Sequence, residues 1–381
     1  MTMPVPIYLD HNATTPVDPR AAEAALPYLT THFGNPASAH AYGETPRRAV
    51  ARARDQVAAL LGAAPGEIVF TGGGSESDTL AIRGAALALR GSGRTEIVTQ
   101  PTEHPAVLEA CRALAADGFT TALLPVDAAG RVAVADLQAA LSRRTALVTI
   151  AHANGETGTL QPIRALAAAA RRAGAVFHTD AAQSVAKVPI DVTDLGVDLL
   201  TLAGHKMYAP KGVGALYVRS GTPMLPVVPG GGQEGGLRAG TENVPWIAAL
   251  GVAAEIAAKA VLDDGPRLAR LRDLLHDELA ALLPGRVHLN GHPGERLPGT
   301  LNVSIDGTDG RALLATVPEI AASTGSACHE GATAPSPVLI AMGVPHVRAA
   351  SAIRLSLGRG TTEDDIREAA RLLAARCGRS G

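Results

Sequence analysis

The sequence of 381 residues contains few aromatic residues, few cysteines and almost no net charge. Aromatic residues make up only 3% of it, so stacking platforms for single-stranded nucleic acid are not expected. The formal net charge is −2 at pH 7, so the chain has no excess of positive charge that would indicate binding to DNA or RNA. The three cysteines, Cys111, Cys328 and Cys377, are odd in number and far apart. They predict a reducing compartment, with neither a disulfide framework nor a metal site.

Long apolar runs are also missing. Charged residues or clusters of glycine and proline interrupt every stretch that has the length of a membrane span. The N-terminus has no basic region before an apolar run, as a secretory signal would have. We therefore expect a soluble, cytoplasmic protein that binds neither membranes nor nucleic acid.

The first part of the chain, from residue 65 to 220, alternates short apolar runs with helical patterns. Several runs are continuously apolar, which is typical of a sheet covered by helices on both faces. The predicted strands are 67–70, 96–99, 146–150, 175–178, 198–202 and 215–218. A helix is predicted over 46–61, with Gly62 as its stop signal. The fold class is therefore α/β, with a mostly parallel sheet.

The pattern changes after a glycine-rich bend at 229–236, and a long helical region follows from about residue 244. Shorter strands are predicted beyond it, at 300–305 and 353–357. The last helix begins after Thr361 or Thr362 as N-cap. We predict a large domain over 15–255 and a small α+β domain formed by 1–14 and 256–381.

Lys206 follows a predicted buried strand, and Asp180 and Gln183 lie one strand–helix–strand unit upstream. A lysine of this kind can capture an aldehyde cofactor as a Schiff base, while an aspartate keeps a pyridine nitrogen protonated. Pyridoxal phosphate (PLP) is the cofactor that needs both. The alternative is a surface lysine and a helix-capping aspartate. Lys211 competes with Lys206, but it precedes a Gly-Val-Gly turn.

Two further loops follow predicted strands. The segment Thr71–Ser77 contains Gly72-Gly73-Gly74 before Ser75, and such a strand-to-helix turn can hold a phosphate. It lacks the lysine of a P-loop, and a plain turn is the alternative. The second loop is Thr102-Glu103-His104. His104 can stack on a pyridine ring and move protons, although a solvated loop histidine is the other interpretation.

The C-terminal part contributes two more candidates. Cys328 lies in a polar, glycine-rich stretch next to His329, where a thiolate nucleophile is chemically reasonable and an inert loop cysteine is the alternative. Arg354 interrupts an apolar strand. It predicts either a salt bridge or a bidentate clamp on a substrate carboxylate.

Taken in order, these motifs resemble those of the cysteine desulfurases, the NifS-like and IscS-like members of the class-V aminotransferases that take sulfur from L-cysteine. The resemblance covers nearly the whole chain. It rests on Tyr8–Pro16, Gly34–Ser38, Thr102–His104, Asp180 with Gln183, Gly204–Lys206, Arg238–Thr241, Gly325–Cys328 and Ile353–Gly358. It implies the type I fold of PLP-dependent transferases, with a seven-stranded sheet in the large domain.

The resemblance also implies roles for residues. Lys206 would bind PLP and Cys328 would accept sulfur, with His104 as the third catalytic residue. The remaining cofactor-binding residues would be Gly74, Ser75, Asp180, Gln183, His205 and Thr241, and the substrate-binding residues Asn12, Asn154 and Arg354. Thr241 would come from a second subunit of a homodimer. The partners implied are L-cysteine and a sulfur-acceptor protein, either a scaffold or a thio-modification enzyme.

The chain departs from the family pattern at two positions. Gly155 stands where a second asparagine is usual, and Ala203 replaces a usual phosphate-binding serine. Restoring either donor is expected to tighten PLP retention. Relatives that dock an iron–sulfur scaffold often carry a further C-terminal segment after the last helix, so the resemblance leaves room for a dedicated sulfur-modification pathway beside general iron–sulfur supply. The alternatives within the fold are a selenocysteine lyase and an aminotransferase, although an aminotransferase does not need Cys328. A non-catalytic sulfur-carrier scaffold is the alternative outside enzymes.

Overall fold

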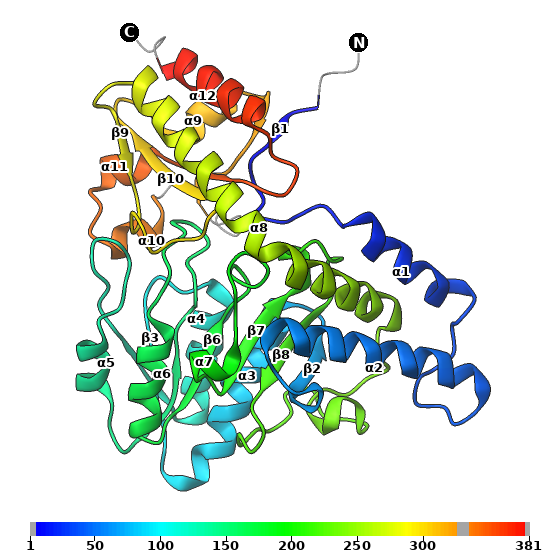
Figure 1. Cartoon of the computed structure of the whole chain (residues 1–381). Coiled ribbons are helices and arrows are strands. Elements are labelled where there is room, and N and C mark those ends of the chain that lie inside the picture. Colours follow the sequence, from blue (N-terminus) through cyan, green and yellow to red (C-terminus); the bar gives the residue numbers. More distant parts are fainter. Residues whose placement is uncertain (1–4, 326–334, 378–381) are drawn as a thin grey trace.

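The computed structural model describes residues 5–325 and 335–377, and it has two packing units connected by one long helix (Figure 1). This helix, α8 (Val244–Leu282), begins beside the central sheet and ends in the smaller unit (Figure 1). Its residues Ala254 and Ala257 pack into the core of the large unit, whereas Leu275 and Leu279 belong to the core of the small one. The predicted domain limit between residues 255 and 256 therefore falls within a helix that both units share. The two predicted domains stay a prediction.

The central sheet is mixed but mostly parallel. Its strand order is β2-β8-β7-β6-β5-β3-β4, and only β8 runs antiparallel to both of its neighbours. The strands are β2 (Ile68–Thr71), β3 (Glu96–Thr99), β4 (Thr120–Leu123), β5 (Thr145–Thr149), β6 (Val176–Asp180), β7 (Leu199–Ala203) and β8 (Gly214–Val218). The six strands predicted in this region are all present. The exposed edge strand β4 was missed.

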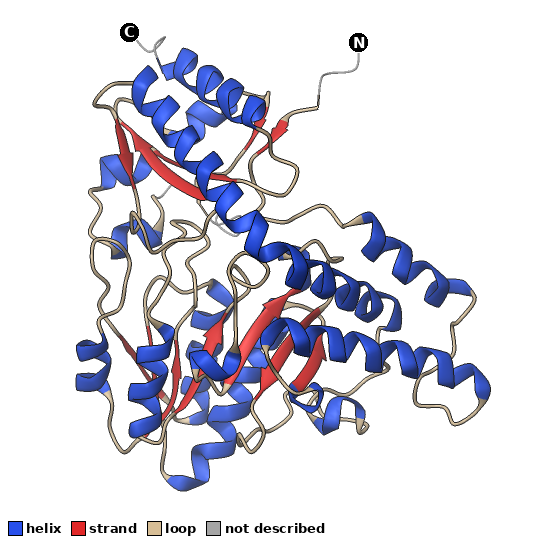
Figure 2. Ribbon diagram, in the orientation of Figure 1, coloured by secondary structure: helices blue, strands red, loops and turns tan. Residues whose placement is uncertain are grey.

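Helices cover both faces of the sheet (Figure 2). Side chains alternate along a strand, so Leu147 packs with α3 (Gly74–Leu89) and α4 (Pro105–Ala113), while Val148 packs towards the opposite face. The helices associated with that opposite layer are α1 (Pro19–Thr30), α2 (Ala41–Leu61), α5 (Val134–Ala140), α6 (Ile163–Arg172), α7 (Val192–Leu195) and the first half of α8. This arrangement confirms the predicted α/β class.

The small unit is built on an antiparallel sheet. Strand β10 (Thr300–Ile305) pairs with β9 (Val287–Leu289) on one side and β12 (Ala352–Ser356) on the other. Near the N-terminus, β1 (Ile7–Tyr8) pairs in parallel with β11 (Ile320–Ala321), which ties the start of the chain to this unit. Its helices are α9 (Gly310–Ala315), α10 (Pro337–Ala341), α11 (His346–Ala350) and α12 (Glu363–Cys377).

The capping residues predicted for two helix ends are present. Gly62 follows α2 with φ of 66°, a left-handed conformation that costs glycine little. Thr362 precedes α12, and its Oγ1 accepts a hydrogen bond from the Asp365 amide at 3.2 Å. The Asp365 carboxylate accepts from the Thr362 amide in return, at 2.9 Å. Thr362, rather than Thr361, is therefore the N-cap.

Among the described helices, α8 is long and apolar enough to cross a membrane by length and composition alone. A long helix was expected here from the sequence, but not a membrane span, because Glu255 and Lys259 interrupt its apolar run. In the structure, 56% of its most apolar window is buried inside the protein. We interpret α8 as a core helix that both units share.

Candidate active site

The candidate residues lie where the parallel strands end. Gly74 begins α3 shortly after β2, and His104 follows β3. Asp180 is the last residue of β6, and Lys206 lies in the 3-10 turn Gly204–Lys206 that follows β7. Because the carboxyl ends of parallel strands meet at one edge of a sheet, these loops converge on one side of the large unit.

Lys206 is covered by the N-terminal segment of the chain. Its Nζ donates hydrogen bonds to the main-chain oxygens of Asn12 and, at 2.9 Å, of Ala13. The same segment holds the turn that carries the lysine, because the Thr15 amide donates to the His205 carbonyl oxygen at 3.0 Å. The motif Tyr8–Pro16 is therefore part of the site.

Asp180 and Gln183 lie close to this lysine. Burial raises the pKa of Asp180, while the charges of His104 and Lys206 lower it, so all three groups share one environment. The Asp180 carboxylate accepts from the Ala182 amide at 2.8 Å and forms no salt bridge within the described part of the chain. Gln183 Nε2 donates at 3.0 Å to the main-chain oxygen of Asn12, the atom that Lys206 also contacts.

Two buried acids beside Asp180 were not predicted from the sequence. Burial raises the pKa of Glu103 to about 8, and it raises the pKa of Asp78 well above its usual value. His178 lies next to Asp78, with 3.7 Å between Nε2 and Oδ1, and burial lowers its pKa to about 3. Near pH 7 Glu103 is thus mainly protonated and the His178 imidazole is neutral, while burial favours the protonated form of Asp78. Asp180 is the acid in this cluster whose ionised form His104 and Lys206 favour.

His104 caps α4. Its Nδ1 accepts a hydrogen bond from the Ala106 amide at 3.1 Å, and the residue is exposed. A ring nitrogen that accepts carries no proton, so the neutral ring has its proton on Nε2. The residue is exposed at the start of α4, and its stacking on the cofactor stays a prediction.

The predicted phosphate loop lies next to the end of β7. A methyl group added to Gly74 would lie 3.2 Å from the Ala203 side chain, so the first turn of α3 packs directly on β7. Ser75 is exposed in that turn. His205 is half-buried and pairs with the Thr14 hydroxyl at 3.2 Å. Burial, together with the nearby charge of Lys206, lowers its pKa to about 4, so this imidazole is neutral near pH 7.

Thr241 is exposed, in the segment before α8. Arg238, three residues earlier, pairs with Glu76 in the first turn of α3 at 2.8 Å. The described contacts do not join Thr241 to Lys206 or to Asp180. Its predicted role in a neighbouring subunit's site stays a prediction.

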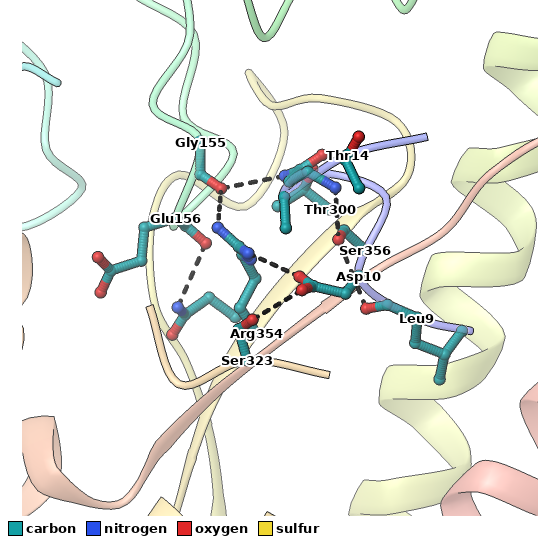
Figure 3. Close-up of polar contacts among 12 residues, drawn as sticks. Leu9, Asp10, Thr14, Gly155, Glu156, Thr300, Ser323, Arg354 and Ser356 are labelled. Carbon is teal, nitrogen blue, oxygen red and sulfur yellow. Dashed lines mark hydrogen bonds and ion pairs between the residues drawn. The ribbon is translucent and has the colours of Figure 1, made fainter. Parts of the chain in front are cut away.

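Arg354 is buried on β12 and faces the N-terminal segment (Figure 3). One guanidinium nitrogen donates to Asp10 Oδ1 at 2.7 Å and another to the Gly155 carbonyl oxygen at 3.1 Å (Figure 3). Ser323 supports Asp10 through a 2.9 Å hydrogen bond. The Arg354 Nε is buried and has no hydrogen-bond partner among the described residues. The salt bridge predicted as one alternative is present, and the Nε–H is left without a described acceptor.

The loop after β5 links this arginine to the sheet. The Asn154 side chain makes one contact within this loop, where Oδ1 accepts from the Glu156 amide at 2.9 Å. It makes another to the loop after β3, where Nδ2 donates to the Thr102 carbonyl oxygen at 3.0 Å. Gly155 has no side chain, and its carbonyl oxygen also accepts from Asn12 Nδ2 at 3.0 Å. Asn154 therefore shapes the loop in this structure, and its contact with substrate stays a prediction.

Cys328 lies outside the described residues. The residues on either side of that segment approach Glu156, which is buried. A methyl group added to Gly325 would lie 3.2 Å from Glu156 Oε2, and Ser336 forms a hydrogen bond with this carboxyl. Burial raises the pKa of Glu156 to about 7. The sequence analysis did not select Glu156, because no local pattern indicates which distant residues it faces.

The residues at the sheet edge fit PLP. Asp180 is a buried carboxylate without a described cationic partner at salt-bridge distance, which suits a protonated pyridine nitrogen. Lys206 and Gln183 donate to one oxygen, so an amine and an amide donor lie side by side. In PLP the aldehyde carbon and the phenolic oxygen are attached to neighbouring ring atoms. These two donors therefore match that pair of groups.

The chain matches known proteins over nearly its full length. Residues 7–368 match the class-V aminotransferase family. A cysteine desulfurase of Trichormus azollae is 47% identical over 362 residues, which cover 94% of this chain and 90% of the relative. The chain belongs to the cysteine desulfurase family. This confirms the resemblance stated from the motifs and the predicted class of enzyme.

Solved structures agree with this family. A NifS-like protein has a TM-score of 0.91 at 35% identity, over 97% of this chain and 99% of that chain. SspA in complex with cysteine has a TM-score of 0.81 at 36% identity, over 92% and 98%. The likeness confirms the predicted type I fold. The class-V aminotransferases are PLP-dependent, which supports the predicted cofactor.

Proposed function

We propose that this cysteine desulfurase holds PLP on Lys206 and moves the sulfur of L-cysteine to Cys328, which leaves L-alanine. Bound PLP supplies an electron sink for the pair released when a bond at the substrate Cα breaks. The observation that carries the proposal is the shared position of Lys206, Gln183 and Asp180 at the sheet edge. Asp180 would stabilise the positive charge of the cofactor's ring, and His104 would stack on that ring.

Lys206 has two tasks in this scheme. Its amine would hold the cofactor's aldehyde carbon, and as a free amine it would take the proton from the substrate Cα. The main-chain oxygens of Asn12 and Ala13 accept from Nζ, so they orient the amine in the absence of cofactor.

Arg354 is the proposed clamp for the substrate carboxylate. Its guanidinium is fixed by Asp10 and Gly155, and its buried Nε has no described partner. A buried donor without a partner is costly, and a carboxylate that accepts from it removes that cost. Asn12 donates to the same Gly155 oxygen, so it supports the clamp from the other side.

The sulfur transfer balances in atoms and electrons. The Cys328 thiolate attacks the sulfur of cysteine, an S–S bond forms and the C–S bond breaks. The electron pair of that bond stays with the substrate Cβ, which becomes the methyl group of alanine after protonation. The transferred sulfur is oxidised to a persulfide on Cys328, and an acceptor protein then removes it.

Alanine release and mass spectrometry of the persulfide test this proposal. Cys328→Ser is expected to keep bound PLP and lose alanine production, because a hydroxyl is too weak an acid to supply the nucleophile. Cys111→Ser and Cys377→Ser are the matched controls and should stay active. Both thiols are buried, and burial raises the pKa of Cys111 to about 12. A persulfide on either control cysteine, or full turnover by Cys328→Ser, contradicts the mechanism.

A homodimer is part of the proposal, since no described contact joins exposed Thr241 to Lys206 or Asp180 of its own subunit. Large apolar side chains are exposed on and after α1, which supports a contact between subunits: Leu26, Leu29, Phe33 and Tyr42. Phe33 and Tyr42 pack on each other with 5.7 Å between ring centres. Light scattering should give twice the monomer mass. Mixed Thr241→Ala and Lys206→Ala subunits should regain partial turnover, and a monomer with full activity would rule the dimer out.

The cytoplasmic location also stays a proposal. It is supported by Cys111 and Cys377, two free cysteines that the structure buries. Localising a tagged full-length chain by cell fractionation tests it, and recovery in an oxidising compartment would contradict it.

A further inference from the structure

A second lysine lies beside Lys206. Lys187 is in the turn after β6, four residues beyond Gln183. Its Nζ donates to Asn12 Oδ1 at 2.7 Å and to Gln183 Oε1 at 3.0 Å. Lys187 and Lys206 line the same small cavity, together with Asn12. No carboxylate of residues 5–325 or 335–377 pairs with Lys187, so an acid does not explain its position.

The backbone before Lys187 is strained. Ala186 has φ of 66°, in the left-handed region that costs a residue with a side chain about 1 kcal/mol or more. Only two other non-glycine residues share this conformation in the described chain, Tyr208 and Glu234. A strained residue persists where surrounding contacts require it. Here the strain presents the Lys187 side chain to Asn12 and Gln183.

These contacts determine which way two amides face. A lysine amine donates to both amide oxygens, so the amide nitrogens must point away from it. The nitrogen of Gln183 then donates to the Asn12 main-chain oxygen, beside Lys206. The nitrogen of Asn12 donates to the Gly155 oxygen and to Thr300 Oγ1.

We propose that Lys187 is a positioning residue that turns the Gln183 amide nitrogen towards the phenolic oxygen of PLP and the Asn12 amide nitrogen towards the substrate clamp. This inference rests on the proposed PLP site. Lys187 itself need not touch cofactor or substrate. With its amine removed, each amide can rotate by half a turn and present oxygen where nitrogen was.

The charges around Lys187 agree with this role. Lys206, Arg354, His11 and His205 are the groups whose charges act on Lys187 or respond to it, and each is a base. Tyr208, Asp264 and Arg359 also line the cavity, and Asp264 pairs with Arg359 rather than with Lys187. Burial lowers the pKa of Lys187 well below its usual value, and the charges of Lys206 and Arg354 lower it further. A neutral amine still has two hydrogens, one for each amide oxygen. The orientation of both amides therefore holds in either protonation state.

The test uses the full chain and PLP itself. Lys187→Met removes both donors with little change in length, and Lys187→Arg restores them. Loss of the Gln183 contact is expected to weaken PLP retention in dialysis about fivefold, the equivalent of one hydrogen bond. The pH midpoint of the bound cofactor's visible absorbance should rise, because the phenolic oxygen loses a donor and a nearby basic group is gone. Lys187→Arg should return both values towards those of the wild type.

A double-mutant cycle separates positioning from a general loss of structure. If Lys187 acts through Gln183, then Lys187→Met should change PLP retention little in a Gln183→Ala background. Equal effects in both backgrounds, or an unshifted midpoint in Lys187→Met, overturn the proposal. Should Lys187→Met not fold, Lys187→Gln is measured in the same way. Failure of the wild type to bind PLP through Lys206 would instead contradict the proposed function.

Discussion

Gly155→Ala is the sharpest steric test of the cofactor site. A Cβ at this position would lie 2.7 Å from Gln183 Nε2, 2.9 Å from its Cδ and 3.0 Å from its Cγ. The Gly155 backbone is outside the left-handed region, so alanine adds no conformational strain there. Its carbonyl contacts with Asn12 and Arg354 are made by the main chain and remain. The three atoms nearest to the added methyl group therefore all belong to Gln183.

The expected magnitude follows from the contacts of that amide. Gln183 donates to the Asn12 main-chain oxygen and accepts from Lys187. An ordinary hydrogen bond contributes about 1 kcal/mol, and one to a charged group about 1.5–3 kcal/mol. If Gln183 is displaced from the cofactor, PLP binding should weaken by about 1–3 kcal/mol, which corresponds to roughly 5- to 150-fold.

Equilibrium dialysis with absorbance detection of PLP measures this change. Gly66→Ala is the matched control, because a Cβ there meets no atom within 4 Å and the backbone is again outside the left-handed region. Thermal unfolding of the apo protein shows whether the variant is folded, since overpacking typically costs about 1–3 kcal/mol. Wild-type PLP affinity in folded Gly155→Ala would refute the reasoning.

The same geometry corrects one expectation from the sequence. Asparagine at position 155 was expected to add a donor and tighten PLP retention. In the structure, the Gln183 side chain occupies the space that any side chain at Gly155 needs. Gly155→Asn is therefore expected to weaken retention, because it adds a larger group than the methyl of alanine.

Three further changes have expected results. Lys206→Ala should abolish the visible absorbance of bound PLP, whereas exposed Lys211→Ala should keep it; a normal band in Lys206→Ala contradicts the assignment. Ala203→Ser should slow PLP loss in dialysis several-fold, because a hydroxyl next to Gly74 gives the phosphate a donor, and an unchanged rate means that other groups suffice. Burial raises the pKa of Glu103 to about 8, above the roughly 4.3 of an unfolded chain, so stability should fall as pH rises between these values. Glu103→Gln should flatten the dependence of Tm on pH in that window, and an equally steep dependence would exclude Glu103 as its source.

Much of the fold could be predicted because buried strands leave continuous apolar runs. Strand β5 was predicted at 146–150 and lies at Thr145–Thr149. Strand β4 was missed because Thr120–Leu123 is exposed at the sheet edge and has no such run. Strands β1 and β11 have two residues each, too few for a pattern. They form through pairing between distant parts of the chain, which local sequence does not indicate.

The candidate site was predictable where a residue follows a strand. Lys206 and Asp180 were selected for that reason, and the structure places them in one environment. Lys187 was missed, although it lies only four residues beyond Gln183. Its partner Asn12 is 175 residues away in the chain, and a lysine in a turn is otherwise typical of a solvent-exposed position.

The N-terminal segment explains why the two units form one site. Asp10 pairs with Arg354 of the small unit, while the Asn12 main-chain oxygen accepts from Lys206 of the large unit. The Asn12 side chain adds contacts with Thr300 on one side and Lys187 on the other. The proposed substrate clamp, Arg354, and the proposed cofactor amine, Lys206, thus both contact the segment 10–12. The relative position of Arg354 and Lys206 depends on this N-terminal segment, which is far in sequence from both β12 and β7. The motifs therefore identified the two residues but did not show that they lie at one site.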